Sequence, residues 1–254
     1  MEENGRDLDL GLAVRVQKIL FPKTSPVCDW GNIGFKNRMA HGVGGDYFDF
    51  LTMSDACQVI FLGDVTGHDL HASLIMALLY GYIHRAFTIP CPCRQIVSQI
   101  NDFLLSFAAR SREFDQFFSS TLFYGIINPR TRKMTYVNAG HPAPLLRRGD
   151  VLFTLPATSR PLGFFHSPEI TMESISLQKE DRLLLYTDGI TEATNESGEP
   201  FGLGRLERIL LQSDCNHLEF LENLFGVLTE FTGKNSPDDD CTAIVVDFNG
   251  QALQ

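Results

Sequence analysis

The sequence predicts an α+β protein built on antiparallel sheets. Segments with strand character form two runs, at residues 34–62 and 119–186, and a pair of predicted helices separates these runs. A second pair of predicted helices precedes a closing strand near the C-terminus. Because the helices are grouped and do not alternate with single strands, this order disfavours a parallel βαβ sheet.

The composition is that of an ordinary globular domain. The chain has 254 residues, of which 44% are hydrophobic and 20% are charged, so it is long enough to bury a large core. No apolar run approaches the roughly 20 residues that cross a bilayer, and the N-terminal letters MEENGRDLDL are acidic, unlike a signal peptide. We therefore expect a cytoplasmic protein with no membrane partner.

The net charge and the cysteines argue against nucleic-acid-binding and zinc-binding proteins. A formal net charge of -10 argues against a nucleic-acid partner, because no basic stripe is present to replace phosphate counterions. The six cysteines are scattered along the chain, which favours reduced thiols and disfavours a zinc site.

The N-terminal segment predicts an amphipathic helix over residues 7–20. Five side chains recur on one side at helical spacing, namely Leu10, Ala13, Val14, Gln17 and Leu20. The Phe21-Pro22 pair ends the helix. This helix either packs on its own domain or serves as a linker or dimerisation helix. The predicted division is therefore a linker or dimerisation helix at residues 1–22 and a single domain at residues 23–254.

The remaining elements follow in order. The first run predicts strands at residues 34–40, 47–53 and 58–62. Two helices come next, and the first of them is apolar on most faces, which predicts burial on both sides; they span 71–87 and 94–109. The second run predicts strands at 119–127, 133–138, 143–147, 151–155, 171–177 and 182–186. Two helices and a strand complete the chain at 204–212, 217–232 and 242–248.

Single aspartates mark the ends of several predicted strands. Asp64 and Asp188 each follow an apolar strand, while Asp46 and the acidic run 238–240 each precede one. One aspartate in such a place is usually a turn former or a helix cap. Four at one sheet edge would repel one another unless cations lay between them. Oxygen ligands without a Cys/His cluster favour Mg²⁺ or Mn²⁺ over zinc.

Five short motifs make the pattern specific: GGDYFD at 44–49, GDVTGH at 63–68, NAGHPAPL at 138–145, YTDGITEA at 186–193 and DDCT at 239–242. They stand in the order found in the SpoIIE/RsbU-like bacterial branch of the PPM-type serine/threonine phosphatases, which the sequence resembles from about residue 10 to residue 248. One position departs from the family pattern, since Asp69 stands where a second glycine usually follows the histidine. Asp69 is predicted to cap the next helix.

The resemblance implies a sandwich of two antiparallel β-sheets flanked by α-helices, with a centre for two divalent cations, Mn²⁺ or Mg²⁺. By motif position, Asp64 would bridge both cations. Asp188 and Asp239 would complete one side of the two-cation centre, and Asp46 would serve the other side. The carbonyl of Val65 would be a further ligand. Whether Asp238 or Asp240 is an additional ligand stays open.

Other polar residues of these motifs have open roles. His68 and His141 either act in catalysis or, as we favour, only satisfy backbone groups. Thr187 and Thr191 are candidates to orient the carboxylates.

The implied activity is hydrolysis of a phosphoserine or phosphothreonine on a regulatory protein by metal-activated water. By resemblance the substrate is a STAS-domain anti-sigma-factor antagonist, and an upstream sensor or a homodimer through the N-terminal helix is expected. The alternative is a catalytically weak phosphatase fold that binds or scaffolds partners, against which the intact aspartates argue. Cysteine-phosphatase chemistry is excluded because no cysteine has an arginine six positions later. The letters GGDYF at 44–48 are similar to the GGDEF motif of diguanylate cyclases. Tyr47 stands in place of the glutamate that this chemistry uses, which argues against a diguanylate cyclase.

Overall fold

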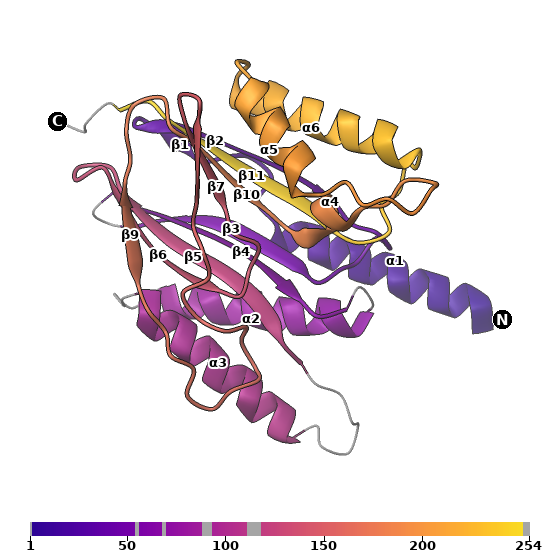
Figure 1. Ribbon diagram of the computed structural model, residues 1–254. Helices are drawn as coiled ribbons and strands as arrows, with labels where there is room; N and C mark the ends of the chain where they lie inside the picture. The colour runs from indigo at the N-terminus through magenta and orange to yellow at the C-terminus, as the bar shows by residue number, and fades with distance from the viewer. Residues whose placement is uncertain (1, 54–55, 68–69, 88–92, 111–117, 251–254) are drawn as a thin grey trace.

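Two antiparallel sheets pack face to face in the computed structural model, which describes residues 2–53, 56–67, 70–87, 93–110 and 118–250, with side chains from residue 11 onward (Figure 1). The six-stranded sheet contains, in spatial order, β1 (Val27–Cys28), β2 (Gly31–Arg38), β11 (Cys241–Phe248), β10 (Arg182–Tyr186), β7 (Leu145–Arg148) and β8 (Val151–Thr154). The five-stranded sheet contains β3 (Asp46–Thr52), β4 (Gln58–Val65), β5 (Ser120–Asn128), β6 (Lys133–Ala139) and β9 (Glu173–Ser176).

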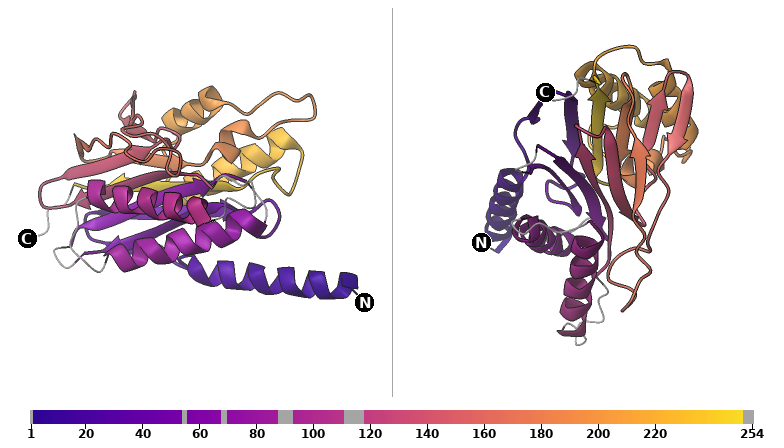
Figure 2. Two further views of the ribbon diagram at one scale, coloured as in Figure 1. Left: turned by 90° about the horizontal axis from the view of Figure 1, so that it is seen from below. Right: turned by 90° about the vertical axis from the view of Figure 1, so that its left-hand side faces the viewer.

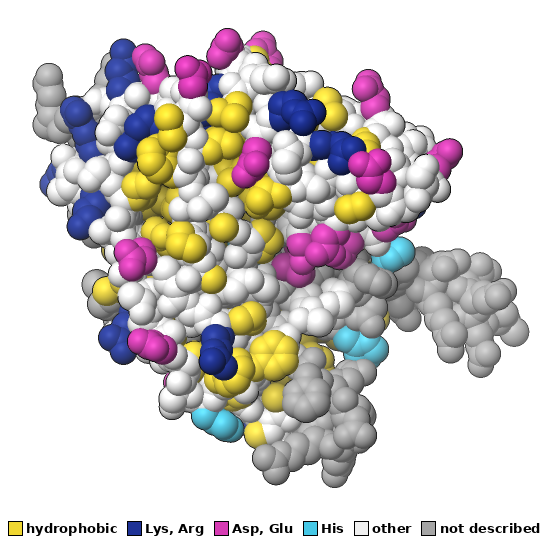
Figure 3. Space-filling view, in the orientation of Figure 1, with side chains coloured by type: hydrophobic (Ala, Val, Ile, Leu, Met, Phe, Trp, Pro, Cys, Tyr) yellow, Lys and Arg dark blue, Asp and Glu magenta, His cyan; other side chains and the backbone are white. Residues whose placement is uncertain are grey.

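Helices cover both outer faces of the sandwich. The five-stranded sheet carries α2 (Leu70–Phe87) and α3 (Cys93–Arg110), and the six-stranded sheet carries α4 (Asp188–Glu192), α5 (Leu203–Gln212) and α6 (His217–Thr232). A further helix, α1 (Glu2–Leu20), lies along the side against α2, and its N-terminal end extends beyond the sandwich (Figure 2). On the face where α4 lies, acidic side chains gather in one group (Figure 3).

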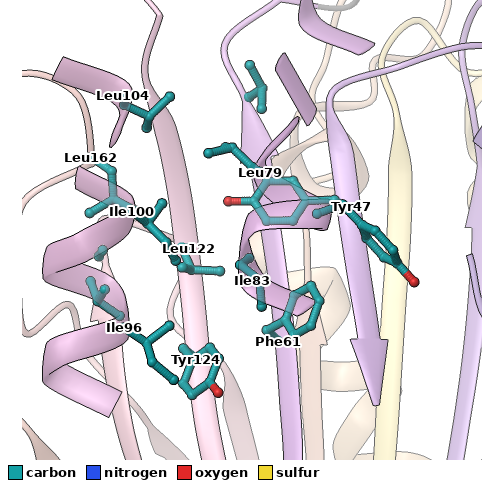
Figure 4. Close-up of a cluster of buried hydrophobic side chains, with 14 of the residues drawn as sticks. Tyr47, Phe61, Leu79, Ile83, Ile96, Ile100, Leu104, Leu122, Tyr124 and Leu162 are labelled. Atoms are coloured by element: carbon teal, nitrogen blue, oxygen red, sulfur yellow. The ribbon is translucent and has the colours of Figure 1, made fainter. Parts of the chain in front are cut away.

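Three apolar layers hold these elements together, and alternation along β4 shows how. Ile60 and Leu62 point between the two sheets, while Val59 and Phe61 point towards α2 and α3. All four are buried, so β4 appears in the sequence as a continuous apolar run. Figure 4 shows the layer under α2 and α3, where side chains of both helices meet those of β5. A third layer joins the six-stranded sheet to α5 and α6.

Local signals set the bounds of α6. The Asn216 side chain accepts hydrogen bonds from the backbone N–H groups of Leu218 and Glu219, and the Glu219 side chain accepts one from the backbone of Asn216. This reciprocal cap satisfies N–H groups that lack partners in the first turn. Gly233 ends the helix with a left-handed φ of 66°.

The predicted α+β architecture with antiparallel sheets is confirmed, and two details differ. The prediction that the helix after Asp64 is buried on both sides is wrong: Leu79 and Ile83 are fully buried, but Leu74 and Leu78 are 58% and 45% exposed. The reason is that α3 lies on the sheet beside α2 and does not cover its outer face. The structure also has a short helix, α4, that begins at Asp188 and is absent from the predicted elements. No described helix has the length and apolar character that crossing a membrane requires.

Candidate metal centre

Cross-strand register brings two of the predicted aspartates together at one end of the five-stranded sheet. Asp46 is paired with Asp64, which is paired in turn with Thr121. Residues directly opposite on antiparallel neighbours point to the same face. With a period of two, that face is also the one of Phe48 and Leu62, which are buried between the sheets. Both carboxylates therefore face the opposite sheet.

Two hydroxyls of the opposite sheet hold Asp46. Thr187 Oγ1 and Thr242 Oγ1 both donate hydrogen bonds to Asp46 Oδ2, at 3.0 Å and 2.5 Å. Asp46 Oδ1 has no hydrogen-bond partner among the described residues. Asp46 is only 1% exposed, and burial raises its pKa well above the ordinary range; the charges of Asp64 and Asp240 raise it further, while the two hydroxyls oppose the shift.

Close backbone contact brings Asp188 beside Asp239. A side chain at Gly189 would lie 2.1 Å from the carbonyl oxygen of Asp240, so the start of α4 touches the segment that precedes β11. Burial raises the pKa of Asp188, and the charge of Asp239 adds to this shift. The second pair of predicted aspartates therefore comes from the start of α4 and from the segment before β11, beside the six-stranded sheet.

The three consecutive acids 238–240 have different surroundings. Asp238 pairs with Lys234 at the surface, with Nζ to Oδ2 at 2.6 Å. Asp240 is buried and accepts hydrogen bonds from the backbone N–H groups of Ala40 at 2.9 Å and Gly45 at 2.8 Å. Asp239 is exposed, and the one hydrogen bond that its carboxylate accepts within the described chain comes from the next backbone N–H, at 2.8 Å. Of the three, Asp239 is thus the acid whose carboxylate is not engaged elsewhere.

Oxygen atoms converge on the open side of Gly45. A methyl group added there would lie 2.4 Å from the carbonyl oxygen of Val65, 2.9 Å from Asp64 Oδ1 and 2.9 Å from the carbonyl oxygen of Gly67. Only a residue without a side chain leaves this space open. The carbonyl of Val65, expected to be a ligand, therefore faces the same space as the Asp64 carboxylate.

Among the described residues, the negative charge at this end of the sandwich is not neutralised by protein cations. Burial raises the pKa of Asp64 to about 8, and the charges of Asp188, Asp239 and Asp240 contribute. In the described part of the chain, no lysine, arginine or histidine forms an ion pair with Asp46, Asp64, Asp188 or Asp239. Figure 3 shows acidic side chains gathered on the surface beside α4.

This donor set fits hard divalent cations. It consists of carboxylate and carbonyl oxygens only, which suits Mg²⁺ or Mn²⁺, and a bound cation would relieve the mutual repulsion of the carboxylates. Within the described ranges, no three His, Cys, Asp or Glu side chains already surround one point as a metal ion would require. The residues fit by type, burial and uncompensated charge, and the side chains would have to draw together around the ions.

Comparison with known proteins identifies the family. The sequence model described as "Stage II sporulation protein E (SpoIIE)" matches residues 54–249, which is most of the chain and includes Asp64, Asp188 and Asp239. The chain belongs to the SpoIIE family of PPM-type phosphatases. Its SpoIIE-family region begins ahead of β4 and ends with β11, so it contains both apolar strands that lead to the aspartates.

Curated relatives of this SpoIIE-family chain include two longer bacterial proteins. Protein IcfG of Synechocystis sp. is 26% identical over 262 residues, which cover 94% of this chain and 41% of IcfG. Phosphoserine phosphatase RsbP of Bacillus subtilis is 30% identical over 189 residues, which cover 73% of this chain and 46% of RsbP. The chain therefore spans less than half the length of these two relatives.

Solved structures share the fold. The SiaA-PP2C domain of Pseudomonas aeruginosa superposes with a TM-score of 0.83 at 18% identity, covering 98% of this chain and 99% of that one. The PP2C phosphatase domain of SpoIIE from Bacillus subtilis gives a TM-score of 0.73 at 20% identity, covering 89% and 64%. The predicted sandwich of two antiparallel sheets flanked by helices is therefore confirmed as the PP2C fold.

The other polar residues of the SpoIIE-family motifs have different surroundings in the structure. His141 is buried, and burial lowers its pKa to about 3. Its Nδ1 lies 3.0 Å from Thr121 Oγ1 of β5, and its Nε2 is buried with no partner among the described residues. Thr187 contacts a carboxylate as predicted, but Thr191 donates to the backbone carbonyl of Asp188 instead. His68 and Asp69, with the predicted cap, lie outside the described residues.

Sequence reasoning assigned no role to Thr242, and it left Asp240 open as a metal ligand without predicting its hydrogen bonds to the backbone. Thr242 closes the DDCT motif, and its place two residues before Ile244 puts it on the same inward face of β11. That spacing was the available signal. The role of Asp240 had no local signal, because its backbone partners are about 200 residues away in sequence.

Proposed function

We propose that this chain is a metal-dependent serine/threonine protein phosphatase that hydrolyses phosphoserine or phosphothreonine on a regulatory protein. The observation that carries the proposal is the meeting of four carboxylates from both sheets at one end of the sandwich, with no protein cation paired to them in the described chain. The relatives RsbP and RsbU of Bacillus subtilis, both named phosphoserine phosphatases, support the reaction class.

Each aspartate has a distinct proposed role. Asp64 would be shared between two cations, because it lies between Asp46 on the neighbouring strand and the charges of Asp188 and Asp239. Asp46 and the Val65 carbonyl would hold one cation, and Asp188 with Asp239 would hold the other. Asp239 is chosen over its neighbours because their carboxylates already bind Lys234 and the backbone.

Bound cations supply the positive charge that neutralises a phosphoryl group and the Lewis acidity that activates water for in-line attack. The residues of the chain prepare the site for this chemistry. The hydroxyls of Thr187 and Thr242 favour the ionised form of Asp46, since hydrogen bonds to a carboxylate lower its pKa. They also fix which oxygen of that carboxylate stays available.

Mn²⁺ or Mg²⁺ is the proposed ion, consistent with the oxygen-only donor set and with the structural neighbour RsbX, which was solved in complex with magnesium. The proposed substrate is a phosphorylated STAS-like regulatory protein, as the resemblance of the sequence motifs to this family implies. The proposed role of residues 1–22 is that of a linker to a sensor or of a dimerisation helix in a cytoplasmic protein. Exposed Leu12, Val16 and Ile19 on α1 support it by their helical spacing.

The test is hydrolysis of a phosphoserine peptide with and without Mn²⁺. We expect turnover only with Mn²⁺, and we expect Asp188→Asn and Asp239→Asn to reduce it by more than about 100-fold, since loss of a group that merely supports a ligand already costs roughly 10- to 100-fold. Asp238→Asn is the matched control: it changes an adjacent acid that is paired with Lys234, and it should keep normal turnover.

Two outcomes would decide against the proposal. Full activity of Asp188→Asn would remove the metal assignment. Absence of Mn²⁺-dependent turnover in the unaltered protein, together with retained binding of a phosphoprotein, would instead establish the binding or scaffold alternative.

A further inference from the structure

The NAGHPAPL motif at 138–145 supplies none of the four aspartates, and it holds a buried histidine in a fixed position. The Asn138 side chain accepts a hydrogen bond from the backbone N–H of His141 at 2.8 Å. Gly140, between them, has a left-handed φ of 68°, which a glycine adopts without strain. This turn directs the His141 ring into the protein interior, where the residue is only 3% exposed.

One nitrogen of the His141 ring contacts the strand next to Asp64. Its Nδ1 lies 3.0 Å from Thr121 Oγ1 on β5, and Thr121 is directly opposite Asp64 of β4. Residues directly opposite on antiparallel neighbours point to the same face, so Thr121, like Asp64, faces the six-stranded sheet. The ring is therefore held between the sheets, at the end where the aspartates meet.

The end of β10 lies on the other side of the ring. Burial lowers the pKa of His141, and the backbone of Tyr186 opposes this shift. Only an acceptor favours the protonated ring, so the group near the ring is the Tyr186 carbonyl. The strand register agrees: the Thr187 N–H donates to the Thr242 carbonyl, so Tyr186, one residue earlier, directs its carbonyl away from β11. On that side β7 pairs with β10 only as far as Leu184.

Nε2 is the nitrogen of the His141 ring that makes no hydrogen bond. It is buried and has no partner in the described chain, while Nδ1 is engaged by Thr121. A neutral ring has one donor and one acceptor, so Nε2 carries the proton when Nδ1 accepts from the Thr121 hydroxyl. A buried donor without a partner costs free energy that a hydrogen bond recovers. A small approach of β10 towards the ring is therefore favourable.

The same approach would assemble the metal centre. Asp188 is two residues after Tyr186, and among the neighbouring carboxylates its charge contributes most to the raised pKa of Asp64. We propose that His141 is a positioning residue whose Nε2–H bonds to the Tyr186 carbonyl as Asp188 and Asp64 draw together around divalent cations. This inference rests on the proposed metal-dependent function and names a residue that favours assembly of its site. His141 itself does not touch the cations.

Nitrogen NMR of the histidine rings tests the hydrogen bond on the full chain, with Mg²⁺ as the probe because it is not paramagnetic. The nitrogen shifts show which ring nitrogen carries the proton, and His141→Gln identifies the His141 signals by their loss. We expect the proton on Nε2, and we expect Mg²⁺ to move the Nε2 signal and to slow the exchange of its proton with water. A proton on Nδ1, or an Nε2 signal that bound Mg²⁺ leaves unchanged, overturns the inference.

Two substitutions separate the roles of the two nitrogens. The amide of Gln reaches the position of Nε2, whereas the amide of Asn stops near the position of Nδ1. We expect His141→Asn to weaken Mg²⁺ binding about tenfold in titration calorimetry, as loss of a group that supports a ligand does, and His141→Gln to bind Mg²⁺ more tightly than His141→Asn. A structural contact with Thr121 alone predicts the reverse order. The matched control, His217→Gln, changes a half-buried histidine of α6 and should bind normally.

The outcomes distinguish this inference from the proposed function. An unchanged Mg²⁺ dissociation constant in folded His141→Asn, or tighter binding by His141→Asn than by His141→Gln, overturns the inference and leaves the proposed function intact. If neither variant folds, the NMR measurement on the unaltered chain decides alone. Absence of divalent-cation binding in the unaltered chain overturns both.

Discussion

Raising the pH should destabilise the metal-free protein in a range where most proteins are insensitive to pH. The pKa of Asp64 is about 8 in the folded chain and near its ordinary value of 3.8 in the unfolded chain. Between these values the folded state holds a proton that the unfolded state has lost, so the free energy of unfolding decreases as the pH rises and levels off above about 8. The same sign applies to Asp46 and Asp188, whose pKa values are also raised.

The useful window lies between pH 6.5 and pH 8, because His141 acts in the opposite direction below it. Burial lowers the pKa of His141 to about 3, so its burial costs stability only where the unfolded histidine is protonated, below about pH 6.5. Within the window, one extra proton on the folded state is worth about 1.4 kcal/mol per pH unit. The total is about 2 kcal/mol, which lowers the melting temperature by about 4–8 °C for a chain of this size.

Thermal unfolding in chelator at pH 6.5, 7.2 and 8.0 measures the effect. Saturating Mn²⁺ should remove the decrease, because a cation stabilises the ionised carboxylates that the metal-free site disfavours. Asp64→Asn is the control that cannot titrate and should show a smaller decrease. A melting temperature that stays constant or rises across the window in chelator, or an equal decrease in Asp64→Asn, would refute the reasoning.

Two further substitutions probe the supports of the site. Thr242→Val keeps the shape of the side chain and removes one of the hydroxyls that donate to Asp46; we expect Mn²⁺ binding to weaken about tenfold in calorimetry, and unchanged binding would argue against that support. Gly45→Ala places a methyl group 2.4 Å from the Val65 carbonyl oxygen and should abolish Mn²⁺ binding and turnover. Its control is Gly226→Ala in α6, where no atom lies within 4 Å, which should retain both and gain up to about 1 kcal/mol in urea unfolding.

Most of the fold was predictable because local patterns and long-range packing agree. The apolar run of β4 and the capped, periodic sequence of α6 specify the same elements in isolation as in the sandwich. The wrong predictions concern residues whose burial depends on a neighbouring element of the fold. Nothing local distinguishes Leu74, which is exposed, from Leu79, which is buried on the same helix, because the five-stranded sheet and α3 together determine which face of α2 is covered.

The candidate site was predictable in its acids and not in their surroundings. Asp64 and Asp188 stand out because each follows an apolar strand. The burial of Asp46, by contrast, depends on Thr187 and Thr242 of the other sheet, 141 and 196 residues away in sequence. Such partners follow from the way the two sheets face each other, which a single sequence does not encode in any local pattern.

The layered fold gives the aspartates a mechanical significance. Asp46 and Asp64 belong to the five-stranded sheet, whereas Asp188 and Asp239 are carried by the six-stranded sheet and its flanks. Cations held by both pairs would cross-link the two sheets, which otherwise pack together through apolar side chains. Any movement that slides one sheet over the other would then change the distance between the two pairs of aspartates. Such a movement in the core would therefore alter the cation site at the end of the sandwich.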